Sequence, residues 1–425
     1  MKVLFSKNNF AGPISGADEI VVAYASELKQ AGHDASVLLI QPPSKRDPLV
    51  ARLRTANVQF DTLASTAFST SLATARRVAI RAMRTFTPVS SLILSNSRKV
   101  VFNLLQQYHN ACCAYLKRTR PDVVHVLTPD PGAVMLVRAA HETNIPVVYQ
   151  EVGIPFHPPG FEEVYERFLT VLPLCTGVAA LSPRLAEELS RVAPHVPSAQ
   201  VLPLISHDHN GTRTSRQERQ RVTFGFAARL EYLKGPVRLL NAFAIAHQTN
   251  SQIELKIAGE GSQRNELINE SRRLGVEEKC RLVGVYMSLK HRDEFMSSID
   301  AFVLPSLTEG TPNVIIEAMA QAKPIIATAI GGVPDLITEE LGILVPPGDN
   351  AELADAMVRL AGDAQLRRTM GVAARRRYEQ LFTPEAVLPL LVSFYEHALQ
   401  VHANGHASGN GHGQLSASLH PWVTR

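Results

Sequence analysis

Two carboxylates eight positions apart, Glu309 and Glu317, are the side chains that most strongly suggest chemistry. The residues between them indicate a tight turn that leads into a helix, with Gly310 supplying the backbone freedom of the turn. Thr311 suits the N-cap and Pro312 the first helical position. Amides at such a helix start bind anions, and carboxylates accept hydrogen bonds from hydroxyls. The segment is therefore expected to hold a phosphorylated ligand. The alternative is an ordinary helix start with two solvated glutamates.

A pair of cations follows the apolar run 222–227, which is typical of a buried strand. Arg229 comes directly after this run, and Lys234 follows five residues later, just before Gly235 and Pro236 begin a helix. Two cations at the carboxyl edge of a parallel sheet would neutralise a diphosphate, Arg with a planar fork and Lys with a point charge. Taken alone, such residues are more often surface charges.

Further glycine-rich turns lie where strands are expected to give way to helices. Each is weak by itself, because many such turns need glycine. The loop of the first half lacks the G-x-G-x-x-G pattern, so a dinucleotide site is not indicated. These turns contain Gly259 and Gly261, then Gly331 and Gly332, and in the first half Gly12, Ser15 and Gly16.

Strand and helix patterns alternate along the chain and restart after a polar stretch, which predicts two doubly wound parallel sheets of the α/β class. Ligands of such folds bind at the carboxyl ends of the strands and in the cleft between domains. The expected parts are a domain at 1–205, a linker at 206–221, a second domain at 222–384, a C-terminal helix at 385–402 that crosses back to the first domain, and a disordered tail at 403–425.

Length and composition agree with a soluble two-domain protein. The chain has 425 residues, 45% of them hydrophobic and 19% charged. No apolar stretch approaches the roughly 18 residues that span a bilayer, and the start looks like a first strand rather than a signal peptide. The four cysteines show no CxxC pattern or other metal spacing, which favours free thiols in a reducing cytoplasm. We expect a cytoplasmic protein without a metal site.

The net charge is only +4, but residues 62–121 contain no Asp or Glu. The basic residues at 76–120 would attract phosphates, an acidic acceptor or anionic lipid headgroups. Arg77, Arg81 and Arg84 fall on one helical face, so peripheral contact with the inner face of a membrane is one interpretation and a solvated basic face is the other. Nucleic acid is disfavoured, because aromatic residues are sparse and no binding motif is present.

The second half closely resembles the retaining glycosyltransferase family four, which has the GT-B fold. The matching segments occur in the family's order over some 120 residues, whereas the first half is similar more loosely. They are Arg229-Leu230 with Lys234-Gly235, the run 257–261, the run 309–320, the run 330–335 and the run 342–349.

This resemblance implies two Rossmann-like domains and a nucleotide-sugar donor held mainly by the C-terminal domain. Arg229 and Lys234 would contact the diphosphate, Glu317 the ribose hydroxyls and Glu309 the donor sugar. The amides of Gly310, Thr311, Pro312 and Asn313 would frame sugar and phosphate, with Gly259 and Gly261 lining the same cleft.

The family usually needs no metal, so the implied cofactor set is empty and the nucleotide sugar is a co-substrate. The implied reaction is transfer of a hexose, with retention, to a saccharide, a lipid-linked compound or another small acceptor bound by the N-terminal domain. Cell-envelope polysaccharide synthesis is the implied setting.

The first half departs from the family pattern at one position. Members often have a histidine after the strand equivalent to 146–149, where this chain has Val152. Glu151 stands beside that position and is a candidate substitute, although a turn carboxylate is the plainer interpretation. His125, at the end of another strand, is a second candidate that is more often structural.

Two other functions stay open. The missing histidine favours a nucleotide-sugar-binding regulator or partner protein that has lost transfer activity. A nucleotide-sugar epimerase of similar form is the other, and the Arg229 and Lys234 set with paired glutamates fits it less well. The sequence specifies neither the base, the sugar, the acceptor nor the oligomeric state.

Overall fold

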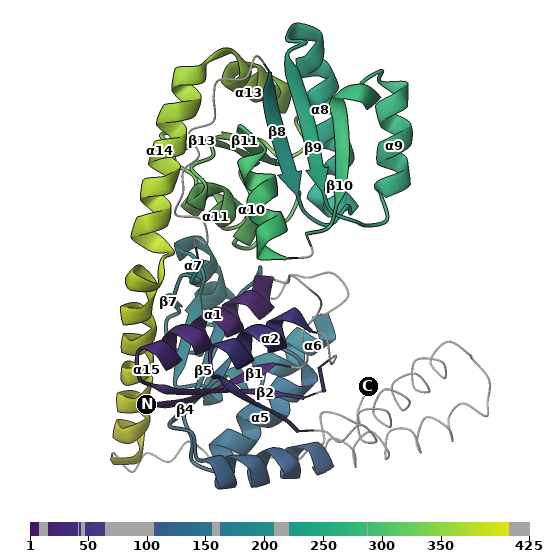
Figure 1. Cartoon of the computed structure of the whole chain (residues 1–425). Helices are drawn as coiled ribbons and strands as arrows, with labels where there is room; N and C mark the ends of the chain where they lie inside the picture. The colour runs from purple at the N-terminus through teal and green to yellow at the C-terminus, as the bar shows by residue number, and fades with distance from the viewer. Residues whose placement is uncertain are drawn as a thin grey trace, which may run out of the picture.

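The structure is a computed structural model that describes residues 1–7, 16–40, 42–43, 47–63, 106–154, 162–207, 221–286 and 288–407. Figure 1 shows two α/β domains stacked one above the other, with the N-terminal domain below. Each domain contains one parallel sheet with helices on its faces.

The N-terminal sheet has the order β3-β2-β1-β4-β5-β6-β7 among the described residues, and every pairing is parallel. Its strands are β1 (Lys2–Lys7), β2 (Asp34–Leu39), β3 (Gln59–Thr62), β4 (Val123–Val126), β5 (Val147–Glu151), β6 (Gly177–Ala180) and β7 (Gln200–Val201). Its helices are α1 (Gly16–Gln30), α2 (Pro48–Thr55), a helix at 106–119, α5 (Pro131–Glu142), α6 (Glu162–Leu169) and α7 (Pro183–Val192).

The C-terminal sheet has the order β10-β9-β8-β11-β12-β13 in the part of the chain that is described, again all parallel. Its strands are β8 (Val222–Ala227), β9 (Ile253–Ala258), β10 (Cys280–Gly284), β11 (Ala301–Leu304), β12 (Ile325–Thr328) and β13 (Gly342–Val345). Its helices are α8 (Pro236–Thr249), α9 (Arg264–Arg273), α10 (Leu289–Ser297), α11 (Asn313–Ala320), α12 (Val333–Leu336) and α13 (Asn350–Gly362).

The central strands are apolar on both faces because helices cover both sides of each sheet. β4, β8, β11 and β12 are buried along their whole length. Aspartates fix several helix starts: the carboxylate of Asp130 accepts the backbone N–H groups of Gly132 and Ala133 at the start of α5. Asp349 caps α13 in the same way.

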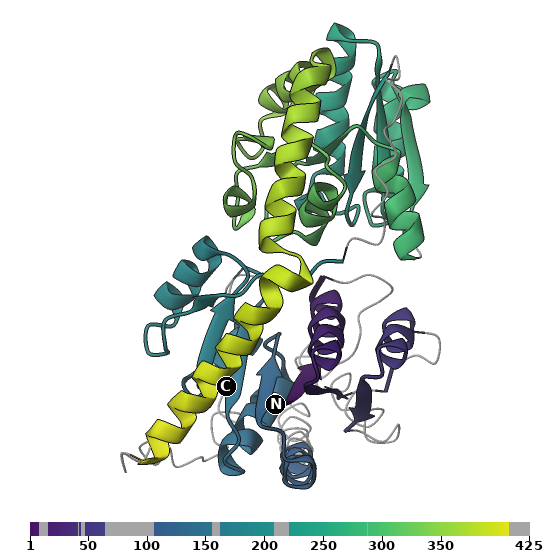
Figure 2. The ribbon, with the colours of Figure 1, turned by 60° about the vertical axis from the view of Figure 1, so that its left-hand side comes forward.

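Two long helices join the domains from the outside. α14 (Ala364–Leu381) lies along the C-terminal domain, and α15 (Pro384–Ala407) continues down the N-terminal domain (Figure 2). The side chains of Val387, Leu391 and Tyr395 are buried against the N-terminal domain. The last helix therefore belongs to the first core, although it follows the second domain in sequence, and it is longer than the predicted 385–402.

The predicted α/β class with two Rossmann-like domains is confirmed. The helix after Glu309 begins one residue later than expected, at Asn313, because Pro312 has extended backbone angles and occupies the cap position. The expected linker (apart from residues 206–207 and 221) and most of the basic stretch lie outside the described residues, as do the last eighteen residues of the tail. Within the described residues, no helix is both long enough and apolar enough to cross a membrane.

Candidate functional site

The chain order of the C-terminal sheet brings two loops together. β8 is the first strand of this domain and pairs with both β9 and β11, so the connections on its two sides leave in opposite directions. A crevice forms where neighbouring connections diverge at the carboxyl ends of parallel strands. The loop after β8 carries Lys234, and the loop after β11 carries Glu309. Residues 75 positions apart thus meet at one edge of the sheet.

Lys234 and Glu309 form an ion pair at this edge. The Nζ of Lys234 lies 2.7 Å from the Oε1 of Glu309, and the two side chains are 19% and 9% exposed. The hydroxyl of Ser306, which is fully buried, donates to the same carboxylate oxygen at 2.7 Å. In turn the hydroxyl of Thr328 donates to the carbonyl of Ser306. The carboxylate of Glu309 therefore has two fixed partners. It holds the ammonium of Lys234 beside the turn that follows β11.

Glycines let three backbone segments approach around this pair. Gly235 has a φ of +71°, and a side chain there would collide with the carbonyl of Pro305. Gly331 has a φ of +49°, and a side chain there would collide with the carbonyl of Glu309. L-residues rarely adopt such backbone angles. The glycines at these two positions are thus required by the fold of the site.

The predicted turn at 259–261 packs on the loop after β8. Gly259 has a φ of +145°, and any side chain there would collide with the carbonyl of Ala228. Gly261 is confined in the same way by the carbonyl of Leu230. Arg229 lies between these contacts and is exposed. The two glycines thus shape the loop that presents Arg229 to solvent.

The start of α11 faces the N-terminal domain. No side chain caps it, so its first backbone N–H groups have no side-chain acceptor there. The side-chain amide of Asn313 lies 3.4 Å from the carbonyl of Gly16 at the start of α1. A side chain on Gly310 would lie within 2.9 Å of the backbone of Gly153, which follows β5. The hydroxyl of Thr311 is buried and unpartnered among the described residues.

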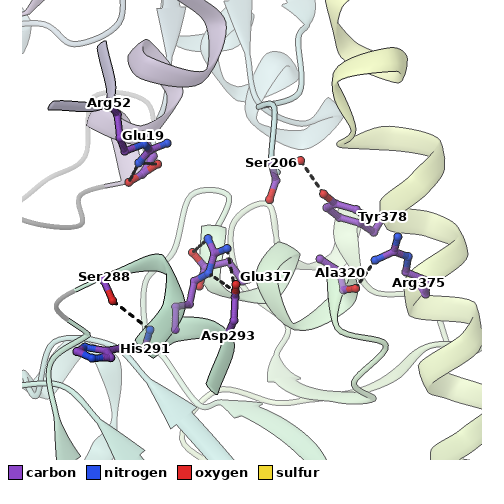
Figure 3. A network of polar contacts seen from close by, with 11 residues as sticks. Glu19, Arg52, Ser206, Ser288, His291, Asp293, Glu317, Ala320, Arg375 and Tyr378 are labelled. Atoms are coloured by element: carbon purple, nitrogen blue, oxygen red, sulfur yellow. Dashed lines mark hydrogen bonds and ion pairs between the residues drawn. The ribbon is translucent and has the colours of Figure 1, made fainter. Parts of the chain in front are cut away.

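Glu317 lies within α11, about one helical turn after its first residue Asn313, in a pocket between the domains. The pocket is lined from α1, α2, α10 and α11 and from residues 204–207. The Nη1 of Arg292 lies 3.7 Å from the Oε1 of Glu317, whose side chain is 14% exposed. Arg292 also donates to Asp293 at 3.1 Å. Figure 3 shows Glu317 beside Asp293, with the Glu19 and Arg52 pair of the N-terminal domain facing them across an open space.

The surroundings of Glu317 favour its neutral form. Burial raises the pKa of this carboxyl to about 7, Arg292 opposes the rise, and Glu19 and Asp293 add to it. Tyr286 is close enough for the charge of Glu317 to raise the pKa of its hydroxyl further, beyond the rise that burial causes. That hydroxyl is buried and has no partner among the described residues. The pocket therefore offers the carboxyl of Glu317 to a polar ligand, and the Tyr286 hydroxyl lies buried near that carboxyl.

Glu151 and Val152 mark the departure from the family pattern. The carboxylate of Glu151 is buried, accepts the Tyr149 hydroxyl at 2.6 Å and accepts the backbone N–H of Gly153 at 2.9 Å. Burial raises its pKa, and these hydrogen bonds oppose the rise. Val152 packs on the hydrophobic core. Glu151 thus holds the loop that touches Gly310, and the structure gives its carboxylate internal partners.

His125 lies in the core of the N-terminal domain. It is fully buried, its Nδ1 lies 2.8 Å from the hydroxyl of Tyr395 on α15, and Phe5 and Tyr24 pack against its ring. Burial lowers its pKa to about 3. This candidate is therefore placed as a structural residue, away from the cleft.

Some predicted residues cannot be placed, and some residues of the site were not predicted. Gly12 and Ser15 lie outside the described residues. Arg292, Tyr286 and Ser306 belong to the two clusters but were not singled out from the sequence. Ser306 has a detectable signal, since it stands three residues before Glu309. Arg292 and Tyr286 have none, because neither belongs to a recognisable motif.

Comparisons with known proteins agree with this architecture. Residues 212–377 match the sequence model of the family "Glycosyl transferases group 1". The capsular polysaccharide biosynthesis glycosyltransferase CapM of Staphylococcus aureus is 30% identical over 175 residues, which are 40% of this chain and 45% of CapM. The putative teichuronic acid biosynthesis glycosyltransferase TuaC of Bacillus subtilis is 25% identical over 56% of this chain and 61% of TuaC. The chain thus spans about half the length of these curated relatives.

Solved structures match over nearly the whole chain. The Anabaena protein Alr3699/HepE, solved in complex with UDP, has a TM-score of 0.69 at 20% identity and covers 93% of this chain and 100% of its own. TarM of S. aureus has a TM-score of 0.71 at 12% identity over 93% of this chain. At these identities the likeness concerns the fold. Residues 212–377 are therefore similar to the glycosyl transferases group 1 family, and the whole chain has the two-domain GT-B fold.

Proposed function

We propose that this protein is a retaining glycosyltransferase that moves a hexose from a nucleotide-sugar donor to a hydroxyl of an acceptor. The observation that carries this proposal is the Lys234 and Glu309 pair, 2.7 Å apart at the switch point of the C-terminal sheet. An uncapped helix start lies directly behind it. An ammonium group and free amides suit a diphosphate, and a fixed carboxylate suits sugar hydroxyls.

Each site residue takes one part of the donor in this proposal. Lys234 and the exposed Arg229 contact the diphosphate, and Glu309 accepts hydrogen bonds from the sugar. Glu317 lies in the pocket between the domains, where it receives the ribose. Solved structures of the Anabaena protein contain UDP, UDP with glucose, or UDP-glucose, which supports a uridine nucleotide as the first donor to test.

The chemistry follows from the charges at the switch point. The bond between the anomeric carbon and the diphosphate oxygen breaks, and negative charge builds on that oxygen. Lys234 and Arg229 stabilise this charge in place of a metal ion. The acceptor oxygen bonds to the anomeric carbon from the same face, and its proton passes to the departing diphosphate. Retention results without a separate general base.

The acceptor binds on the N-terminal domain in this proposal. Gly12, Ser15 and Gly16 follow β1 in the chain, and Gly16, the first residue of α1, touches Asn313 of the donor domain. Curated relatives are named for capsular polysaccharide and teichuronic acid synthesis, which supports a saccharide or lipid-linked acceptor of the cell envelope. The basic stretch at 76–120 would bring the protein to an anionic membrane that carries such an acceptor.

Thermal shift and turnover on a panel of nucleotide sugars test this function. A bound donor at 100 times its dissociation constant adds about 2.7 kcal/mol to the free energy of unfolding, so the right donor raises the melting temperature. The same donor should be hydrolysed, or transferred to saccharide acceptors, with retained anomeric configuration and with no loss of rate in a chelator.

A binding protein without transfer activity is the second candidate. The observation that favours it is Val152, which packs on the hydrophobic core at the position where family members often have a histidine. Stabilisation by a donor with no turnover across a broad acceptor panel would support this second function. Inverted product stereochemistry, or a requirement for a divalent metal, would instead refute the proposed mechanism.

A further inference from the structure

We propose that His109, Cys113 and Glu142 form a binding site for a divalent transition metal of the zinc type, separate from the sugar-transfer site. His109 and Cys113 lie on the helix at 106–119, and Glu142 is the last residue of α5. Within the described residues, this is the group whose ligand atoms all lie within 4.8 Å of one another. The helix at 106–119 lies at the end of the N-terminal domain that points away from the C-terminal domain (Figure 1).

The distances fit a tetrahedral ion. The Nε2 of His109 lies 3.3 Å from the Oε1 of Glu142, and the Sγ of Cys113 lies 3.9 Å from both that Nε2 and the Oε2 of Glu142. Ligands bound to Zn²⁺ at about 2.0–2.3 Å in a tetrahedron lie about 3.3–3.6 Å from one another. The nitrogen and oxygen already have this separation, and the sulfur must approach by only a few tenths of an ångström.

The backbone pre-organises the three ligands. Residues four apart on a helix share one face, so His109 and Cys113 point the same way without any loop rearrangement. The imidazole is 10% exposed, and the carboxylate that completes the triangle is 53% exposed. The exposed carboxylate is free to adjust, and the fourth ligand position opens toward solvent. This arrangement resembles a three-ligand site that keeps one position for water.

The ligand types favour zinc over a hard cation. Thiolate and imidazole select zinc and related metals, whereas Mg²⁺ and Ca²⁺ take oxygen ligands. A thiolate and a carboxylate neutralise the two charges of the ion. Metal binding displaces the thiol proton of Cys113, so it strengthens as the pH rises.

Occupation would connect two helices of the N-terminal domain. The helix at 106–119 precedes β4 in the chain, and α5 follows it. The ion would therefore cross-link the two helices that flank this strand in sequence. Its effect is expected on the stability of this domain. The test therefore uses binding and stability, and its outcome does not depend on whether the protein transfers sugars.

Cobalt spectroscopy of the full chain tests the site, because thiolate-bound Co²⁺ gives a charge-transfer absorption in the near ultraviolet. After removal of metals with a chelator, one equivalent of Co²⁺ should produce this band, and Zn²⁺ should displace it. Cys113→Ser should abolish the band, and His109→Asn and Glu142→Gln should each weaken Zn²⁺ binding by about tenfold or more. Cys280→Ser is the matched control, since this partly buried thiol lies outside the cluster.

Two results would overturn the site. One is a cobalt band that Cys113→Ser leaves intact, which would assign the metal to another thiol. The other is saturable binding without any thiolate band, which would assign it to imidazoles alone, such as those at the chain end. If a variant is less stable without metal, its melting temperature in the metal-free state shows this. The variants are then compared by the increase in melting temperature that added metal causes in each of them.

Discussion

The carboxylate of Glu309 is engaged on two sides before any substrate arrives. Lys234 and Ser306 both contact its Oε1 at 2.7 Å, and little of the side chain is exposed. A diphosphate that enters the site would compete with this carboxylate for the ammonium. The pair therefore keeps the cation oriented in the empty site and makes it available when the donor binds.

Glu317 should make nucleotide binding depend on pH. Its pKa is raised to about 7, first by burial, and hydroxyls of a ribose donate best to the ionised form. Uridine diphosphate affinity, measured by calorimetry, should therefore be constant above this pKa and fall by up to about tenfold per pH unit below it. Glu317→Gln should remove this dependence, and Glu340→Gln, which changes an exposed glutamate, should keep it. A dependence that persists in Glu317→Gln would contradict the assigned role.

The raised pKa of Glu317 should also make the stability of the fold depend on pH. A carboxyl whose pKa is higher in the folded state binds more protons there than in the unfolded chain. The free energy of unfolding therefore falls as the pH rises from the ordinary value of 4.5 to about 7. Glu317→Gln should gain stability relative to the parent above that range, which pH-dependent denaturant unfolding would measure. An unchanged difference across the range would mean that the carboxyl is not buried as described.

At the residue scale the sequence indicated Lys234 and Glu309 but not their neighbours. Lys234 was predicted to lie at the carboxyl edge of a sheet, and the structure brings it into contact with Glu309, while the roles of both residues stay predictions. Arg292 reaches Glu317 from a different helix, and such long-range pairs leave no local pattern. His125 stood at a strand end, but its burial depends on α15, which packs there from the far end of the chain.

Among the elements, the turn at Gly331 should be the most sensitive to substitution. Its positive φ and the nearby carbonyl of Glu309 leave no room for a side chain. Gly331→Ala should lower the free energy of unfolding by about 1–3 kcal/mol and displace the Glu309 backbone, with loss of transfer activity.

Gly362→Ala provides the matched control, because a side chain at Gly362 meets nothing within 4 Å. It should leave activity unchanged and add about 0.4–1 kcal/mol through the unfolded state. Denaturant titration and a transfer assay compare the two. Equal behaviour of both variants would contradict the claim that this turn positions the site.

The elements themselves were predictable where apolar runs and turn residues coincide. The alternation of strands and helices gave both sheets their class, since buried parallel strands appear as continuous apolar runs. The short helix α2 and the exposed strand β3 were not singled out, because their residues are mixed in polarity. The start of α11 was displaced by one residue because both Thr311 and Pro312 are compatible with a helix N-terminus.

At the scale of the whole molecule, α15 ties the end of the chain to the first domain. Leu391 is fully buried against that domain, whereas Leu390 beside it is 49% exposed. Leu391→Ala should lower the free energy of unfolding by about 2–5 kcal/mol, and Leu390→Ala should stay within about 0.5 kcal/mol. Chemical denaturation of both variants measures this difference. Similar losses in both would contradict the packing of α15.

The relation between the two domains was the least accessible to sequence reasoning. It rests on a few contacts across the interface, such as Arg184 with Asp335, and Asn313 with Gly16. Each residue is unremarkable in its own segment, and only the assembled fold places it opposite its partner. Most of the acceptor loop and most of the basic stretch lie outside the described residues, so acceptor identity and membrane contact stay predictions.

The most direct test of the donor site is the single-turnover rate of sugar transfer by Lys234→Ala with the donor that stabilises the parent protein. Loss of one preorganised charge at the leaving group should slow transfer by about a hundredfold or more in a variant that is still folded at the assay temperature. Lys290→Ala, which removes an ammonium that is 83% exposed on α10, should keep the parent rate. A parent-like rate in Lys234→Ala would contradict the account.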